Sequence, residues 1–144
     1  MFNKNILLVE DNPSDIELTS RALDKSKISC NLIIKEDGAD ALKYLFEECG
    51  TPEGDDYPAL ILLDLKLPII DGLEVLKQVK SNDKTKRIPI VVLTTSTEDD
   101  DMNNSYDLGA NAYIRKPVDN ERFLVAINYL GLFWLTINEP THRY

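Results

Sequence analysis

The chain has 144 residues, 43% of them hydrophobic, and its 25 acidic and 16 basic residues give a net charge of −9. This length suits one globular domain with a real core, and the acidic balance argues against binding to DNA, RNA or an anionic membrane. No apolar stretch approaches the roughly 20 residues of a transmembrane helix, and the N-terminus has no signal-peptide pattern. We therefore expect a soluble, cytoplasmic protein. Cys30 and Cys49 fit neither a CxxC pair nor a metal spacing, so we expect buried, reduced thiols.

Strand-like and helix-like patterns alternate along the first half of the chain. Asn12 and Pro13 are typical of a helix cap and of a first helical position, so a helix should begin directly after the first strand. Apolar residues at i, i+3, i+4 and i+7 from Leu42 indicate a further helix, which Gly50 should end. The elements expected here are a strand at residues 6–9, a helix that begins at 13 and fades near 26–29, a strand at 30–35, and the helix that ends at 50.

The second half continues the alternation from the stretch ALILLDLKLPIIDG, residues 59–72. Its apolar run predicts a strand buried on both faces, and this strand stops at Asp64. Pro68 and the pair Asp71-Gly72 then predict a loop. Residues 97–100 resemble a capping box with Asp in place of Glu, which predicts the start of a polar helix. The elements expected after the loop are a helix at about 73–80, a strand at 88–93, the polar helix, a strand at 112–115, and a last helix from about residue 120.

Five strand runs that alternate with five helices predict an α/β domain with a parallel sheet covered on both faces. Polar side chains follow four of these runs: Glu10 and Asp11, Asp64, Thr94, and Lys116. In an open parallel sheet the carboxyl ends of the strands form one edge, and ligands bind there. We therefore expect these five residues to share one site.

The residue types at this edge point to phosphoryl transfer. Three crowded carboxylates raise one another's pKa unless a cation sits among them, and hard oxygen ligands suit Mg²⁺. A lysine and a threonine hydroxyl would complete a cradle for a tetrahedral anion. Carboxylate nucleophile, Mg²⁺, Lys116 and Thr94 are together the components needed to transfer a phosphoryl group onto Asp64.

Four motifs in this order make the sequence resemble the receiver domain of two-component response regulators. They are LLVEDN at residues 7–12, LLDLKLPIIDG at 62–72, VVLTTS at 91–96 and AYIRKP at 112–117, and the resemblance covers nearly the whole chain. It implies a doubly wound, flavodoxin-like fold with five parallel strands in the order 2-1-3-4-5, five helices and a short C-terminal extension. We expect a receiver domain over residues 1–135 and a tail over 136–144.

The resemblance also assigns roles at the phosphorylation site. Asp64 would be the phospho-acceptor, and Glu10 and Asp11 would be the acid pair that binds Mg²⁺, with Glu10 acting mostly through water. The backbone carbonyl of Lys66 would be the remaining protein ligand. The protein would then be a phospho-acceptor signalling protein rather than an enzyme, assisting only its own phosphorylation and dephosphorylation.

Three further residues would transmit the signal. Thr94 would be the switch hydroxyl that moves toward the phosphoryl group, Tyr113 the aromatic side chain that turns inward with it, and Lys116 the salt-bridge partner of the phosphate. The bond between Lys116 and Pro117 resembles the cis peptide of the family.

Two further features resemble the stand-alone response regulators of bacterial phytochrome-type histidine kinases. These are the acidic insertion at residues 50–58 and the cluster Phe133, Trp134 and Leu135. Three consecutive large apolar side chains cannot all face inward from one helix, so we expect a homodimer contact there. Output would pass by contact with an effector protein, by a change of dimer, or by onward phosphotransfer.

Other functions remain as alternatives. A degenerate receiver could serve as a binding scaffold that is not phosphorylated. A haloacid-dehalogenase-like phosphohydrolase also uses a strand-end Asp with Mg²⁺, but Lys66 stands where its general acid belongs. A nucleotide or flavin binder would need a Gly-rich phosphate loop, and none follows a strand here.

Overall fold

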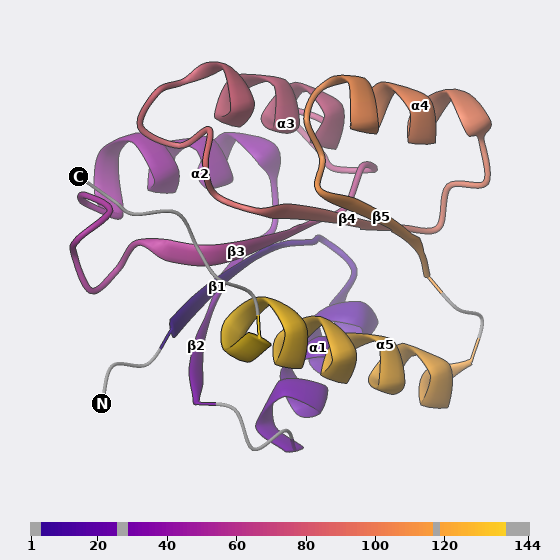
Figure 1. Cartoon of the computed structure of the whole chain (residues 1–144). Coiled ribbons are helices and arrows are strands. Elements are labelled where there is room, and N and C mark those ends of the chain that lie inside the picture. The colour runs from indigo at the N-terminus through magenta and orange to yellow at the C-terminus, as the bar shows by residue number, and fades with distance from the viewer. Residues whose placement is uncertain (1–3, 26–28, 117–118, 138–144) are drawn as a thin grey trace.

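The computed structural model describes residues 4–25, 29–116 and 119–137. Within these residues, five strands and five α-helices alternate along the chain (Figure 1). The strands are β1 (Lys4–Val9), β2 (Cys30–Lys35), β3 (Pro58–Leu63), β4 (Ile90–Thr94) and β5 (Ala112–Arg115). The helices are α1 (Pro13–Lys25), α2 (Gly38–Lys43), α3 (Gly72–Ser81), α4 (Asp99–Asp107) and α5 (Asn120–Leu132). None of the helices in the described ranges is long and apolar enough to cross a membrane.

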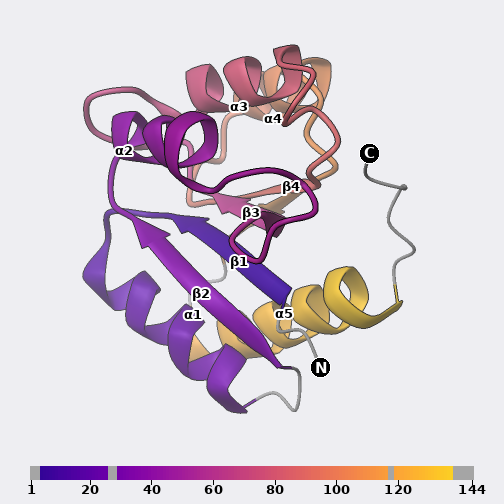
Figure 2. The ribbon, with the colours of Figure 1, turned by 90° about the vertical axis from the view of Figure 1, so that its left-hand side faces the viewer.

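The strands form one parallel sheet in the order β2-β1-β3-β4-β5, which confirms the predicted doubly wound topology. Strand β1 lies between β2 and β3, with Leu7 level with Ile33 on one side and with Ile61 on the other. The chain leaves β1 for one edge of the sheet and returns to the other side of β1, so the winding direction reverses there (Figure 2). The ends of β1 and β3 are the switch point at which such sheets bind ligands.

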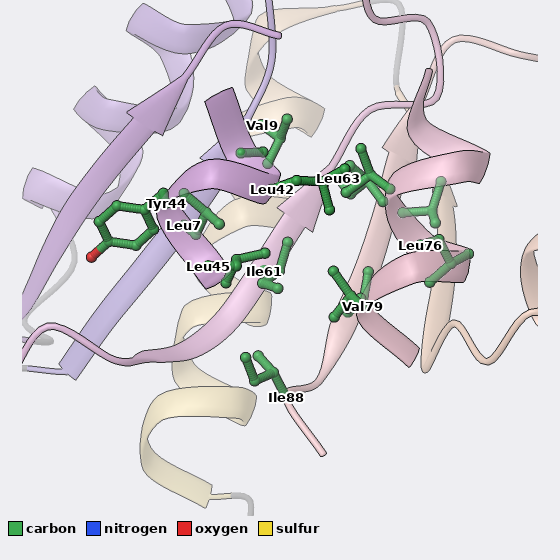
Figure 3. Packing of buried hydrophobic residues seen from close by; sticks show 14 of the residues in the cluster. Leu7, Val9, Leu42, Tyr44, Leu45, Ile61, Leu63, Leu76, Val79 and Ile88 are labelled. Atoms are coloured by element: carbon green, nitrogen blue, oxygen red, sulfur yellow. The ribbon is translucent and has the colours of Figure 1, made fainter. Parts of the chain in front are cut away.

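Helices cover both faces of the sheet. Helices α1 and α5 lie on one face and α2, α3 and α4 on the other (Figures 1 and 2). Successive strand residues point to opposite faces, so Ile6 and Leu8 pack under α1 and α5, whereas Leu7 and Val9 pack under α2 and α3. Figure 3 shows the second of these cores, in which strand and helix residues interdigitate. Strands buried on both faces explain why their sequences are continuous apolar runs.

Most helices begin at a short polar side chain that accepts a backbone N–H. The N–H of Asp15 donates to Asn12 Oδ1 at 3.1 Å, as predicted, and Asp71 caps α3 in the same way. The capping box predicted at residues 97–100 is wrong: α4 begins at Asp99, and Glu98 at the cap position makes no side-chain cap bond. The hydroxyl of Ser96 instead accepts the N–H of Glu98 at 3.3 Å and donates to the Asp101 carboxylate at 2.5 Å, which ties the preceding loop to the start of α4.

Two helices, α2 and α5, end in a π-helical turn. Helix α2 continues as a π-helical turn, η1 (Tyr44–Glu48), before Gly50 ends it at φ 78°, and α5 continues as η2 (Phe133–Ile137). The helix predicted to end at Gly50 is thus confirmed with a wider last turn.

One cysteine and the bounds of two strands, β1 and β4, differ from the prediction. Strand β1 begins at Lys4 rather than at residue 6. Cys30 and Cys49 are both free, but only Cys49 is buried, since Cys30 lies on the edge strand β2. Strand β4 begins at Ile90 rather than at residue 88. Pro89 has no N–H for the ladder, and only its carbonyl takes part, accepting the N–H of Ile61 at 2.9 Å.

Candidate functional site

Two neighbouring strands carry the acidic residues to one point. Glu10 follows β1 and Asp64 follows β3, and both are buried, whereas Asp11 is exposed. The ladder continues past the strand ends, because the N–H of Asp64 donates to the carbonyl of Val9 at 3.0 Å. One carboxylate oxygen from each of Glu10, Asp11 and Asp64 lies within 4.8 Å of the others. The predicted acidic cluster therefore exists in the described part of the chain.

Lys116 enters this cluster from β5. Its backbone N–H donates to the carbonyl of Thr94 at 2.7 Å, which extends the ladder between β4 and β5 beyond its last strand pair. Its ammonium group contacts Glu10 and lies 3.4 Å from Asp64 Oδ2. The lysine side chain is only 4% exposed, so these contacts are shielded from water. Side chains from the ends of β1, β3 and β5 thus meet in one site, and Thr94 at the end of β4 is joined to Lys116 through its backbone carbonyl.

Asp15 belongs to this site as well, and the sequence reading missed it. Its Oδ2 lies 2.7 Å from Lys116 Nζ, closer than Asp64 does. Asp15 stands in the first turn of α1, a helix that starts two residues after Asp11 at the edge of the site. An acid in the first turn of a helix that begins at the predicted site is the signal that could have identified Asp15.

Burial and charge oppose each other at the two central groups. Burial raises the pKa of Glu10 from 4.5 to about 7; the hydrogen bond from Lys116 opposes this rise and the charge of Asp64 adds to it. Burial by itself lowers the pKa of Lys116, but hydrogen bonds to Asp15 and Glu10 and the charge of Asp64 outweigh it, so this pKa is raised. The lysine is therefore fully charged, and the carboxylates still carry an excess of negative charge.

The donor set fits a hard divalent cation. The side-chain ligand atoms of the cluster are all carboxylate oxygens. The single ammonium group of Lys116 faces three carboxylates. A cavity of about 420 Å³ adjoins the cluster and is lined by Asp11, Lys66, Asp71 and Asp101 among others. The N–H of Lys66 donates to Asp64 Oδ1 at 3.3 Å, which orients the acceptor carboxylate; its carbonyl as a metal ligand stays a prediction.

The two predicted switch residues are neighbours on one face of the sheet. Thr94 is fully buried at the end of β4, and its Oγ1 accepts the N–H of Ser96 at 3.3 Å. Tyr113 on β5 lies level with Val92 on β4, and Thr94 follows Val92 by two residues on the same strand. The side chains of Tyr113 and Thr94 therefore point to the same face of the sheet as diagonal neighbours. Among the described residues, the buried hydroxyl of Tyr113 has no hydrogen-bond partner. Pro117 lies outside the described residues, and with it the predicted cis bond.

The C-terminal aromatic cluster is divided between core and surface. Leu135 is 4% exposed and packs in the core beneath α1 and α5, so it offers no surface to a partner. Trp134 is half-buried, with its ring at 89° to that of Phe133 and a centroid distance of 5.1 Å. Phe133 is 46% exposed, as expected for at least one of the three. Three more exposed side chains continue along this helix, namely Val125, Tyr129 and Leu132.

A five-stranded 2-1-3-4-5 sheet with an acidic cluster and a buried lysine at its switch point defines the class of protein. Residues 6–128 match the family model described as the response regulator receiver domain. The chain belongs to this family and is a signalling protein of the two-component type.

Among the similar proteins, several are phytochrome response regulators. The chain is 44% identical to the response regulator Rcp1 of Synechocystis over 138 residues, covering 95% of this chain and 93% of that protein. The crystal structure of the phosphorylated cyanobacterial phytochrome response regulator RcpA has a TM-score of 0.89 at 41% identity, covering 97% of this chain and 99% of the other. The Mn²⁺-bound form of Rcp1 has a TM-score of 0.88 at 42% identity, with 96% and 99% covered.

Proposed function

We propose that this protein accepts a phosphoryl group from a histidine kinase onto Asp64 while Mg²⁺ is bound. A carboxylate oxygen of Asp64 forms a bond to phosphorus as the phosphorus–nitrogen bond of the donor phosphohistidine breaks, and the bonding pair leaves with the imidazole nitrogen. The residues that would hold the metal are Glu10, Asp11, Asp64 and, through its carbonyl, Lys66; a bound metal would supply positive charge to offset that of the transferring group.

The observation that carries this proposal is the contact of Lys116 with Glu10 and Asp64 at the switch point. A buried ammonium beside an acceptor carboxylate is positioned to bind a phosphoryl oxygen once the group is attached. Two relatives support the same chemistry, since RcpA has been crystallised in a phosphorylated form and Rcp1 in an Mn²⁺-bound form.

The signal leaves the site through Thr94 and Tyr113. The Thr94 hydroxyl moves toward the phosphoryl group, and Tyr113 turns inward into the space beside it. The buried Tyr113 hydroxyl without a partner supports this role, because an unsatisfied hydroxyl favours a second arrangement in which it is paired. The change is read by a partner at the face formed by α4, β5 and α5.

The relatives suggest the partners. A phytochrome-type histidine kinase in the cytoplasm is the donor, and an effector or phosphotransfer protein receives the output. The protein catalyses no reaction on a separate substrate. Residues 1–135 form the receiver domain and 136–144 a tail, of which 138–144 lie outside the described residues.

A homodimer is the second part of the proposal. Val125, Tyr129, Leu132 and Phe133 lie at i, i+4, i+7 and i+8 and so share one side of α5 and its last turn. All four are exposed, and Tyr129 is 69% exposed. A contiguous apolar stripe of this kind marks a subunit contact. Of the predicted contact residues Phe133, Trp134 and Leu135, this stripe keeps Phe133 and leaves out the buried Leu135.

Intact-protein mass tests the phosphorylation. The wild type and Asp64→Asn are incubated with acetyl phosphate, with and without Mg²⁺. We expect one added phosphoryl group on the wild type only, and only with Mg²⁺. A gain on Asp64→Asn would place the phosphoryl group elsewhere, and no gain under any condition would leave a receiver that acts as a binding scaffold.

A further inference from the structure

The ammonium group of Lys116 is shared among three carboxylates. It contacts Glu10, lies 2.7 Å from Asp15 Oδ2, and lies 3.4 Å from Asp64 Oδ2. A lysine ammonium has three N–H donors, so these carboxylates occupy all of them. The closer approach to Asp15 than to Asp64 means that the ammonium is drawn toward α1 and away from the acceptor.

The carboxylate of Asp15 projects from a firmly held turn of helix. The N–H of Asp15 donates to Asn12 Oδ1 at 3.1 Å, and the carbonyl of Asp15 accepts the hydroxyl of Thr19 at 2.8 Å. The Asp15 side chain is 20% exposed and that of Lys116 is 4% exposed. An ion pair shielded to this degree is weakened less by solvent than a surface pair, so Asp15 can fix where the ammonium rests.

We propose that Asp15 is a positioning residue that holds Lys116 back from Asp64 and thereby keeps the acceptor carboxylate available. The proposal rests on the function proposed above. Without Asp15, the ammonium closes on Asp64 and competes with a divalent cation for the same oxygen. The same contact occupies the lone pairs with which Asp64 attacks phosphorus, so phosphorylation slows as well.

Asp15 forms no bond to phosphorus and acts only through the lysine. After transfer, Glu10 and Asp15 retain two of the three ammonium donors, and the third donor is directed to an oxygen of the phosphoryl group. The position of the ammonium is thus set before the phosphoryl group arrives. A group positioned in advance accelerates a reaction because it does not have to be reoriented during the reaction.

The test compares Asp15→Ala and Asp15→Asn in two backgrounds, the wild type and Lys116→Met, in which the side chain keeps its size but has no charge. Glu17→Gln is the matched control, because it removes an acid from the same helix that pairs with Arg21 instead. The dissociation constant for Mg²⁺ is measured by calorimetry on metal-free protein, and the rate of phosphorylation by acetyl phosphate is measured by mass. Thermal unfolding verifies that each variant is folded.

We expect Asp15→Ala to weaken Mg²⁺ binding and to slow phosphorylation, each on the order of tenfold, and Asp15→Asn to act in the same direction but less strongly. In the Lys116→Met background, Asp15 can affect Mg²⁺ only through its own negative charge. Substitution of Asp15 should therefore raise the dissociation constant for Mg²⁺ by only about twofold. The control Glu17→Gln should resemble the wild type in both measurements.

Equal losses of Mg²⁺ affinity in the two backgrounds would overturn the proposal, because they would show that Asp15 acts by its charge and not through Lys116. Unchanged binding in Asp15→Ala would overturn it too. If Asp15→Ala does not fold, Asp15→Asn carries the same comparison. A wild type that binds Mg²⁺ but takes no phosphoryl group would refute the proposed function, while the Mg²⁺ titrations would still decide the role of Asp15.

Discussion

Lys116 is almost completely enclosed by carboxylates, and this enclosure decides what its removal does. It partly neutralises Glu10, Asp15 and Asp64, so a protein without this cation has more negative charge to offer a metal. We expect Lys116→Met to bind Mg²⁺ at least as tightly as the wild type, whereas Asp11→Ala should bind it more weakly. Calorimetric titration distinguishes the two, and an equal loss of affinity in both variants would show that the lysine supports the metal rather than the phosphate.

Ile69 stores strain in the loop between β3 and α3. It is the single non-glycine residue with positive φ among the described residues, at 69°, and its side chain is 79% exposed. A β-branched residue in this region of φ costs about 1–3 kcal/mol. Little packing is lost on its removal, so we expect Ile69→Gly to raise the free energy of unfolding by about 1 kcal/mol in urea titrations.

The neighbouring isoleucine provides the control for this substitution. Ile70 is half-buried against the core, does not have positive φ, and donates its N–H to the carbonyl of Pro68 at 2.8 Å. Ile70→Gly should therefore lower the free energy of unfolding. A stabilisation of both variants would mean that general loop flexibility, and not strain at Ile69, is responsible.

At the scale of elements, the loop from β3 to α3 is held tightly against the strand end that carries Asp64. The N–H of Gly72 donates to the carbonyl of Leu65 at 3.0 Å, and a Cβ on Gly72 would lie 2.2 Å from the carbonyl oxygen of Asp64. Neither the carbonyl of Leu65 nor that of Asp64 can move without displacing the carboxylate of Asp64. The first residue of α3 must therefore be glycine.

We expect Gly72→Ala to lower the free energy of unfolding by about 1–3 kcal/mol and to slow phosphorylation of Asp64. Urea titration and mass after acetyl phosphate treatment measure the two effects. Gly54→Ala is the comparison, since a Cβ there would lie no closer than 3.2 Å to its nearest neighbour, Thr51. Wild-type phosphorylation of Gly72→Ala would show that the strand end tolerates the shift.

Helix α4 is connected to the switch threonine through Ser96. The N–H of Ser96 donates to Thr94 Oγ1, while its hydroxyl bonds to Asp101 in the first turn of α4. In the proposed switch, movement of the Thr94 hydroxyl toward a phosphoryl group would break the first of these bonds and leave the second. We therefore expect the start of α4 to respond to this movement first.

At the scale of the whole molecule, the apolar stripe on α5 should mediate self-association. We expect the double substitution Tyr129→Ser and Phe133→Ser to lower the molar mass measured by light scattering from that of a dimer to that of a monomer. Both side chains are exposed, so the fold should be unaffected. Tyr106→Ser on α4 is the control, because Tyr106 is an exposed aromatic residue outside the stripe. A monomeric wild type, or a dimeric double variant, would contradict the proposed contact.

The sequence alone determined the order of the elements and the residues at the strand ends. Buried parallel strands produce continuous apolar runs, and helices produce a 3.6-residue period, so both are written in local patterns. Glu10, Asp11, Asp64 and Lys116 each follow such a run, and the carboxyl ends of parallel strands meet at one edge. The fold and most of the acidic cluster could therefore be predicted without coordinates.

The tertiary structure alone decided contacts between side chains that local patterns do not relate. Asp15 and Lys116 are far apart in the sequence and meet only because the Lys116 side chain reaches from the end of β5 to the first turn of α1. Ser96 bonds to the start of α4 because the path of the loop brings its hydroxyl to Glu98 and Asp101. Leu135 is buried while Phe133 is exposed because the packing of the last helical turn selects which side faces the core. Such choices depend on the rotation of helices and the path of loops, which packing fixes and periodicity does not.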